Sequence, residues 1–412
     1  MEKQFEIFKN TVPKFKEIKS LNPEGEFKGI KAITYDGANV GDKKTKAFAY
    51  IGFPEKICGK VPAIVLVHGG GGVSYLPWVK MWNTKGYAAI AMCNTGYFPK
   101  KINAGLMEHG QHLKEYWEYG LFGEFEEDGY VSSPKCDDVT KTESPYEEQF
   151  LYHAVSQTIL ASNILRDDSR VDENKIGITG ISWGGIITSL TLRYDKRYAF
   201  AIPIYGSGYL PNADGGFCNV FFENAKNIDD FLAEKGFDDI TFPVLWLCWD
   251  KDGAFHLDGN CRSYMQTVKN NSDTRISIVY EMNHSHVCGW VREESFVFAD
   301  SVTGGGPKLP TFKMDGGKLF VDNPDNVHIS YIRCFYLKEQ MSYIDDEIFQ
   351  RKMVQDWYID TLKCGDYVIK DTVPEDAACY YYQITFLIDG REYITTSVCN
   401  FDSKKENLKI VF

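Results

Sequence analysis

Hydrophobic residues gather into short continuous runs along the middle of the chain. Six runs have the length of buried strands: Ala63–Val67, Tyr87–Cys93, Lys175–Thr179, Tyr198–Ile204, Pro243–Trp249 and Arg275–Glu281. A long helical pattern covers Pro145–Arg166, and Ser144 and Glu147 predict a capping box at its start. Continuous apolar strands that alternate with amphipathic helices are typical of a mostly parallel sheet with helices on both faces. We therefore predict an α/β fold.

The two ends of the chain have a different pattern, with shorter strands bounded by turn residues. Near the N-terminus, Asp36-Gly37 predicts a hairpin turn within residues 29–51. Residues 303–310 are rich in glycine and proline, as expected of a linker. We predict an α/β domain with an N-terminal β extension over residues 1–306, and a small β-sandwich over residues 307–412.

Three strands are predicted within the C-terminal part: His328–Leu337, Tyr380–Ile388 and Tyr393–Val398. Asp389-Gly390 separates the last two and is a strong signal for a tight hairpin. One helical stretch, Asp345–Leu362, interrupts this β pattern. We expect it to form a long connection within the sandwich.

Charge and composition exclude several classes of protein. The 412 residues carry 45 Lys and Arg against 57 Asp and Glu, a net charge of −12, so nucleic acid is not an expected partner. No run of 18 apolar residues predicts a membrane span. Eleven cysteines without a C-x-x-C pair or a signal peptide indicate reduced thiols, no zinc site and a cytoplasmic location. A secreted chain already trimmed of its leader would look the same.

A candidate nucleophile lies between the predicted strand Lys175–Thr179 and a helical pattern. The motif is Gly180-Ile181-Ser182-Trp183-Gly184. Small residues two before and two after a serine permit the sharp strand-to-helix turn of a nucleophile elbow. That turn exposes the hydroxyl and directs a helix N-terminus at the reacting atoms. We predict that Ser182 is a nucleophile; the alternative is a tight structural turn.

A serine nucleophile needs a base to accept its proton and an acid to orient that base. In α/β-hydrolases the chain order is serine, acid, histidine. Asp250 and Asp252 both follow the strand Pro243–Trp249. We predict Asp252 as the acid, because it lies further into the loop, while Asp250 is the alternative and could cap the turn.

Two histidines follow the strand Arg275–Glu281, and either could be the base. We predict His286, because a small residue precedes it and because it lies nearer the next helix, expected from about Val291. His284 is the alternative base. The residue that is not the base is expected to shape the pocket.

The glycines after His68 are candidates for an oxyanion hole, which donates backbone N–H groups to a developing negative charge. We predict donors at Gly70, at Gly71 and at Trp183, the residue after the nucleophile. The G-x-G-x-x-G register of a dinucleotide site is lacking. His68 itself is expected to have a structural hydrogen-bonding role.

Aromatic residues near the carboxyl ends of strands are candidates for substrate binding, because ligands bind at that edge of such sheets. Tyr97, Tyr205 and Trp290 are predicted in this role, with core packing as the alternative for each. The polar stretch of residues 96–144 contains His109 and His112 and is expected to form a partial lid.

Three segments carry a resemblance to a known family: Thr179–Gly185, Ile202–Tyr209 and Met282–Trp290. They resemble the acetyl xylan esterase-like branch of the dienelactone hydrolase and prolyl oligopeptidase-type α/β-hydrolases, and the likeness covers most of the chain after Val61. The resemblance implies an α/β-hydrolase fold with a C-terminal immunoglobulin-like β domain. The chain departs from the family at Trp249–Asp252, where a Gly-Thr-Asn-Asp run is usual, but it keeps the aspartate register.

These observations predict a serine esterase that hydrolyses short acyl esters, acetyl above all, on carbohydrate through an acyl-enzyme. The expected partner is a small-molecule or oligosaccharide ester, and no metal or other cofactor is expected. One alternative is a serine peptidase or acyl-peptide hydrolase with the same triad. Another is a non-catalytic carbohydrate-binding protein that acts through its β domain.

Overall fold

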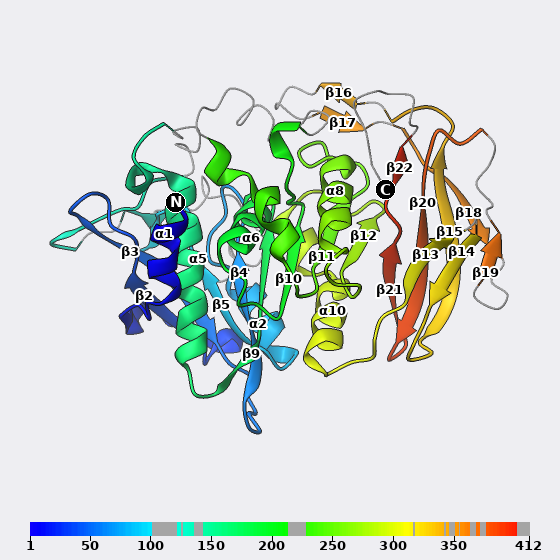
Figure 1. Ribbon diagram of the computed structural model, residues 1–412. Helices are drawn as coiled ribbons and strands as arrows, with labels where there is room; N and C mark the ends of the chain where they lie inside the picture. Colours follow the sequence, from blue (N-terminus) through cyan, green and yellow to red (C-terminus); the bar gives the residue numbers. More distant parts are fainter. Residues whose placement is uncertain are drawn as a thin grey trace.

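One sheet runs through the length of the molecule (Figure 1). The computed structural model describes residues 1–100, 122–124, 127–135, 143–212, 228–315, 318–341, 343–345, 351–353, 355–362, 368–370 and 376–401. The central strands of the sheet, in spatial order, are β5 (Ala88–Met92), β4 (Val61–Val67), β9 (Val171–Ile181), β10 (Phe200–Ile204), β11 (Leu245–Trp249) and β12 (Arg275–Val279). All neighbouring pairs among them are parallel. The six predicted strands are thus confirmed, and the α/β class with them.

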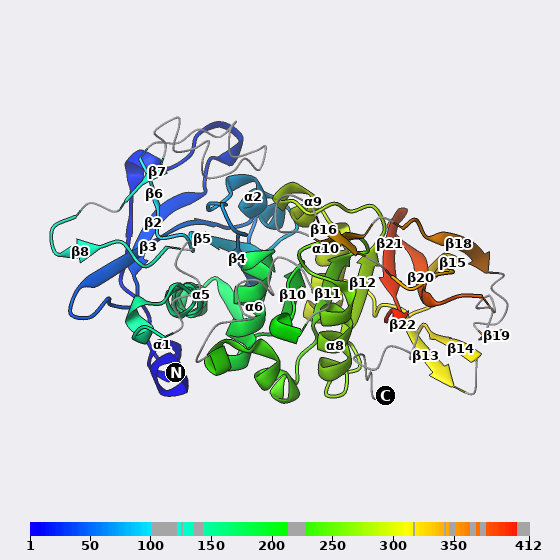
Figure 2. The same cartoon turned by 90° about the horizontal axis from the view of Figure 1, so that it is seen from above.

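Helices cover both faces of the parallel strands, as Figure 2 shows. One face carries α5 (Phe150–Asp167), α6 (Trp183–Tyr194) and α8 (Leu257–Thr267), and the other carries α2 (Leu76–Thr84), α9 (His286–Trp290) and α10 (Glu293–Thr303). The strands are buried almost throughout, because each is covered from both sides. The predicted capping box forms a 3₁₀ turn over Tyr146–Glu148, and α5 begins after Gln149 without a side-chain cap.

The N-terminal part extends the sheet with antiparallel strands. These are β1 (Phe15–Glu17), β2 (Lys31–Asp36) and β3 (Lys44–Gly52), which pairs with β5. The connection predicted as a two-residue turn at Asp36-Gly37 spans residues 37–43 instead. Short strands nearby are β6 (Phe98–Pro99), β7 (Phe122–Gly123) and β8 (Tyr130–Val131).

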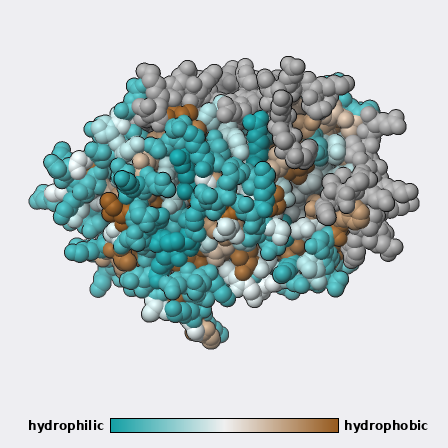
Figure 3. Space-filling model, in the orientation of Figure 1, coloured by the Kyte–Doolittle hydropathy of each residue, from teal (hydrophilic) through white to brown (hydrophobic). Residues whose placement is uncertain are grey.

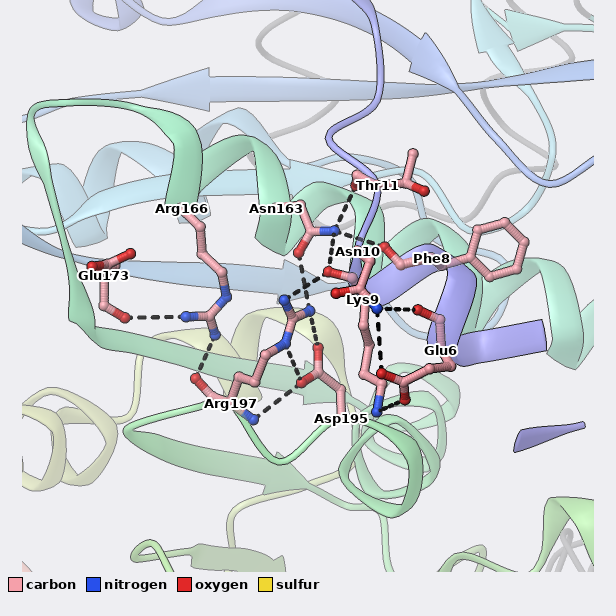
Figure 4. A network of polar contacts seen from close by, with 10 residues as sticks. All are labelled: Glu6, Phe8, Lys9, Asn10, Thr11, Asn163, Arg166, Glu173, Asp195 and Arg197. Atoms are coloured by element: carbon pink, nitrogen blue, oxygen red, sulfur yellow. Dashed lines mark hydrogen bonds and ion pairs between the residues drawn. The ribbon is translucent and has the colours of Figure 1, made fainter. Parts of the chain in front are cut away.

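The N-terminal helix α1 (Glu2–Lys9) is anchored to the outside of α5 by side chains that bind its last carbonyl groups (Figure 4). The amide of Asn163 donates to the carbonyl oxygens of Phe8 at 2.8 Å and of Thr11 at 2.7 Å. The guanidinium of Arg197 donates to the Lys9 carbonyl at 2.8 Å while it pairs with Asp195 at 2.6 Å. These contacts add hydrogen-bond donors to carbonyl groups at and just beyond the C-terminal end of the helix.

The C-terminal strands continue the same sheet. Strand β21 (Arg391–Thr396) pairs with β12, followed by β20 (Cys379–Ile388), β15 (His328–Leu337) and β18 (Tyr358–Leu362). The sheet therefore crosses the predicted boundary between residues 306 and 307. The Asp389-Gly390 hairpin is confirmed: both residues have positive φ, 51° and 76°, as a type I′ turn requires.

The rest of the C-terminal part forms smaller pieces of sheet. These are β13 (Thr311–Asp315), β14 (Lys318–Asp322) and β19 (Val368–Lys370) in one sheet, β16 (Tyr343–Asp345) with β17 (Arg351–Met353) in another, and β22 (Asn400–Phe401) beside β20. The helix predicted over Asp345–Leu362 is wrong. Its last five residues form β18, where pairing along β15 overrides the helical spacing of the sequence.

Where Figure 3 is coloured, the surface is mostly hydrophilic, and its hydrophobic residues lie in small separate spots. Within the described residues, no helix combines the length and the apolar character needed to cross a bilayer.

Candidate active site

Ser182 lies at a sharp turn between β9 and α6. Its backbone has φ 58° and ψ −118°, a conformation that is rare for residues other than glycine. A Cβ atom at Gly180 would lie 2.1 Å from the Gly184 carbonyl oxygen, and one at Gly184 would lie 2.0 Å from the carbonyl oxygen of Val67. Glycine is therefore required on both sides of the serine, as the G-x-S-x-G pattern predicts.

The hydroxyl of Ser182 is hydrogen-bonded to an imidazole, and that imidazole to a carboxylate. His284 Nε2 lies 2.9 Å from Ser182 Oγ, and His284 Nδ1 lies 2.8 Å from Asp252 Oδ2. Asp252 is 2 % exposed, and its other oxygen accepts the N–H groups of Ala254 and Phe255 at 2.8 and 3.0 Å. These two backbone donors fix the carboxylate so that Oδ2 faces the histidine. The structure thus brings Ser182, Asp252 and His284 together from the ends of three strands.

The expectation that His286 contacts the serine is wrong. His286 is the first residue of α9, and its Nε2 accepts the backbone N–H of Gly69 at 3.0 Å. Ser285 is the N-cap of α9, and its hydroxyl accepts the N–H of Cys288 at 3.0 Å. A serine N-cap directly before His286 was a sequence signal for this helix start. The helix expected from about Val291 begins at Glu293, as α10.

Two aromatic rings hold the His284 imidazole. The ring of Tyr205 stacks on it with centroids 4.6 Å apart, and Phe255 lies nearly parallel to it at 5.9 Å. The hydroxyl of Tyr205 donates to the carbonyl oxygen of Asn283 at 2.6 Å, and Asn283 has a left-handed φ of 63°. Burial raises the pKa of Tyr205 far above its usual value, so the phenol remains a donor.

The aromatic residues predicted for substrate binding have different surroundings. Tyr205 is fully buried and contacts the histidine, so it has no surface to offer a substrate. Trp290 is 4 % exposed and packs edge-on against Tyr75 at 4.8 Å, as in the core-packing alternative. Tyr97 is partly exposed and lies beneath the amino group of Lys135 at 4.9 Å, so its role stays a prediction. His109 and His112, with most of the expected lid, lie outside the described residues.

The glycine loop after β4 lies directly against the elbow. A Cβ atom at Gly69 would lie 3.1 Å from Ser182 Cβ, and one at Gly70 would lie 2.4 Å from Trp183 Cδ1. The N–H of Gly69 is bound by His286, so it does not face the serine. The remaining predicted donors are Gly70 and Gly71 in this loop and the N–H of Trp183, the first residue of α6.

His68 holds the start of this loop, as its predicted structural role requires. Its Nε2 accepts the N–H of Asn94 at 3.1 Å, so Nδ1 carries the proton and donates to the Gly69 carbonyl at 2.8 Å. Burial lowers the pKa of His68 to about 4, which keeps the ring neutral near pH 7.

Comparison with known proteins gives no match to a protein-family profile and none to a curated sequence. Similar solved structures include an acetyl xylan esterase from Paenibacillus sp. R4 (16 % identity over 68 % of this chain and 85 % of that one, TM-score 0.46). Acetyl xylan esterase 1 from Thermoanaerobacterium sp. JW/SL YS485 has 15 % identity over 67 % and 86 %, with a TM-score of 0.43. An acylaminoacyl peptidase from Pyrococcus horikoshii has 16 % identity over 70 % of this chain, which spans 43 % of that protein, with a TM-score of 0.46.

The described residues form a mixed α/β fold with a central, largely parallel sheet covered by helices. At these identities and TM-scores the similarities carry no argument about activity, so the chemistry is argued below from the residues of this chain.

Proposed function

We propose that this chain is a serine esterase that hydrolyses short acyl esters, with acetyl groups on carbohydrate as the expected substrate class. The observation that carries the proposal is the continuous hydrogen-bonded path from Ser182 Oγ through His284 to Asp252, with distances of 2.9 and 2.8 Å. A nucleophile, a base and an acid in this arrangement are sufficient for acyl transfer. The acetyl-carbohydrate part of the proposal rests on the resemblance of the three sequence motifs.

In the first half of the reaction, Ser182 Oγ attacks the ester carbonyl carbon while His284 Nε2 takes the hydroxyl proton. Asp252 accepts the Nδ1–H of His284 and stabilises the imidazolium that forms. The N–H groups of Trp183 and of Gly70 or Gly71 bind the oxyanion. The C–O bond to the alcohol then breaks, and His284 gives its proton to the departing alcohol.

In the second half, water attacks the acyl-enzyme. His284 removes a proton from that water, the bond between the acyl carbon and Ser182 Oγ breaks, and the serine recovers its proton from the imidazolium. The products are the free carboxylic acid and the resting enzyme.

Covalent labelling tests the proposal. A fluorophosphonate should modify Ser182 in the intact protein, and peptide mapping should locate the adduct there. The pair His284→Gln and His286→Gln gives a matched control, since the two residues are two apart in the same loop region. Labelling and p-nitrophenyl acetate turnover should be lost in His284→Gln and retained in large part in His286→Gln. An unlabelled Ser182 in the folded wild type would end the proposal.

Esterase and peptidase activity are separated by leaving group. We expect turnover of p-nitrophenyl acetate with at most trace turnover of an aminoacyl p-nitroanilide. Comparable rates on both substrates would favour the acyl-peptide hydrolase alternative. Sugar binding without turnover of any activated ester would favour the carbohydrate-binding alternative.

A further inference from the structure

The carboxylate of Asp250 joins three parts of the chain that are far apart in sequence. Asp250 follows β11 directly and is 1 % exposed. Its Oδ1 accepts the N–H of Glu281, at the start of the loop that carries His284, at 3.0 Å. Its Oδ2 accepts the indole N–H of Trp357, the residue before β18 in the C-terminal part, at 3.0 Å. The two oxygens of this buried carboxylate therefore connect the backbone of Glu281 to the side chain of Trp357.

The histidine loop depends on this contact because its backbone is held in an unusual conformation. Glu281 has a left-handed φ of 58°, and the hydrogen bond from its N–H to Asp250 anchors the loop at that residue. Asp252, the partner of His284, lies two residues after Asp250 in the same turn. A shift of the Asp250 carboxylate would therefore move both the acid and the base.

On the C-terminal side of the contact, Trp357 is buried against other aromatic rings. Trp357 is 6 % exposed and lies edge-on to Tyr381 at 5.0 Å, and Tyr381 stacks on Phe335 at 4.8 Å. The neighbouring residue Asp356 pairs with Lys251 at 2.5 Å. Two consecutive residues of the C-terminal part thus bind two consecutive residues of the acid loop.

We propose that the C-terminal β region is a positioning element for the triad, in which Trp357 holds the acid and histidine loops in register through Asp250. This inference rests on the proposed function, because it assigns Asp252 and His284 to catalysis. It gives the C-terminal strands a role in the rate of the reaction that does not require them to contact substrate.

The protonation of Asp250 links this contact to pH. Burial raises the pKa of Asp250 to about 6, while the N–H of Glu281, the charge of Lys251 and the indole of Trp357 favour the carboxylate. Among the described residues, Tyr381 and Cys248 also lie within range of its charge, and both are buried and have raised pKa values. Removal of the indole donor should raise the pKa of Asp250 further. The contact to Glu281 would then weaken at a higher pH than in the wild type.

The test is Trp357→Phe, which keeps an aromatic ring and removes the N–H. The matched control is Trp246→Phe, because Trp246 lies in β11, is fully buried and donates its indole N–H to Thr267 at 3.0 Å, away from both loops. The concentration of active enzyme is taken from the fraction of protein that the fluorophosphonate labels. On that basis, kcat should fall about tenfold in Trp357→Phe, and KM should stay within about twofold of the wild-type value. The acidic limb of its pH profile should move to higher pH. Trp246→Phe should lower the stability of the protein and leave kcat and the acidic limb of the pH profile unchanged.

A double-mutant cycle identifies Asp250 as the intermediary. In an Asp250→Asn background, Trp357→Phe should have little further effect on kcat and should no longer move the acidic limb. Additive effects, or a Trp357→Phe variant with the kcat and pH profile of Trp246→Phe, would overturn the proposal.

A readout that does not need turnover separates this proposal from the proposed function. The ring signals of His284 in ¹³C-histidine-labelled protein, assigned with His284→Gln, should shift in Trp357→Phe and not in Trp246→Phe. Unchanged signals would overturn the positioning role even if the wild type proved inactive on esters. An inactive, unlabelled wild type with shifted signals would instead reject the proposed function alone.

Discussion

The backbone N–H of Gly69 donates a hydrogen bond to Nε2 of His286, with 3.0 Å between the nitrogen atoms. This contact ties the glycine loop after β4 to the start of α9. His286 also lies against the ring of Tyr75, at 5.0 Å between centroids, so its own position is fixed by packing. The second histidine of the motif therefore supports the candidate oxyanion loop rather than the nucleophile.

His286→Ala should leave the Gly69 N–H buried without its acceptor, a cost of about 1–3 kcal/mol. We expect kcat to fall by up to about 10²-fold, because a displaced loop weakens the stabilisation of the oxyanion. His284→Ala should cost about 10³–10⁶-fold. His286→Gln supplies an acceptor again and should recover most of the loss. Steady-state kinetics with p-nitrophenyl acetate measure all three, and equal losses in His286→Ala and His284→Ala would contradict this assignment.

Tyr205→Phe should preserve the ring stacked on His284 and remove the hydrogen bond to the Asn283 carbonyl. That bond is worth about 1 kcal/mol, so we expect a several-fold fall in kcat. Tyr205→Leu, which also removes the stacked ring, should cost more. Tyr50→Phe is the control, because Tyr50 is equally buried but its hydroxyl has no hydrogen-bond partner within the described part of the chain. A Tyr205→Phe enzyme with the wild-type rate would show that the hydroxyl does not position the base.

Acid should destabilise the protein in part through His153. This residue is buried in α5, its Nε2 lies 2.8 Å from the Glu147 carbonyl oxygen, and burial lowers its pKa to about 4. The usual pKa of histidine is about 6.5, so between pH 6.5 and 4 the unfolded chain binds more protons than the native one. The free energy of unfolding should therefore fall as pH drops through this window. His153→Gln should show a smaller difference between urea unfolding at pH 7 and at pH 5, and an unchanged difference would contradict the prediction.

Asn163→Ala should loosen the N-terminal helix without affecting turnover. It removes the amide that binds the carbonyl groups of Phe8 and Thr11 (Figure 4), and leaves them partly buried without that donor. We expect a loss of about 1–3 kcal/mol and a lower Tm in thermal unfolding. Lys80→Ala is the control: its partner Glu55 is 87 % exposed, and a surface ion pair contributes about 0–1 kcal/mol. Equal Tm values for the two variants would show that α1 is not held by Asn163.

The parallel part of the fold could be predicted from the sequence because its strands and helices each have a recognisable local pattern of residues. Strands buried on both faces are continuously apolar, so all six runs were recognisable without knowledge of their neighbours. The Asp389-Gly390 hairpin was equally local, since its two positive φ angles select those residue types. The helix predicted over Asp345–Leu362 failed because a paired strand depends on its partner, here β15, which is distant in sequence.

In the candidate site, too, some positions depend on local sequence patterns and others on contacts between distant residues. The elbow at Ser182 and a carboxylate at Asp252 were predictable from residue types at strand ends, with Asp250 left open as the alternative to Asp252. The choice between His284 and His286 depended on where α9 begins and on two left-handed residues, Glu281 and Asn283, which turn one imidazole toward the serine and the other toward Gly69. Long-range packing brings His284 to Ser182 and Trp357 to Asp250, and hydrogen bonds between residues far apart in sequence produce no periodic pattern along the chain.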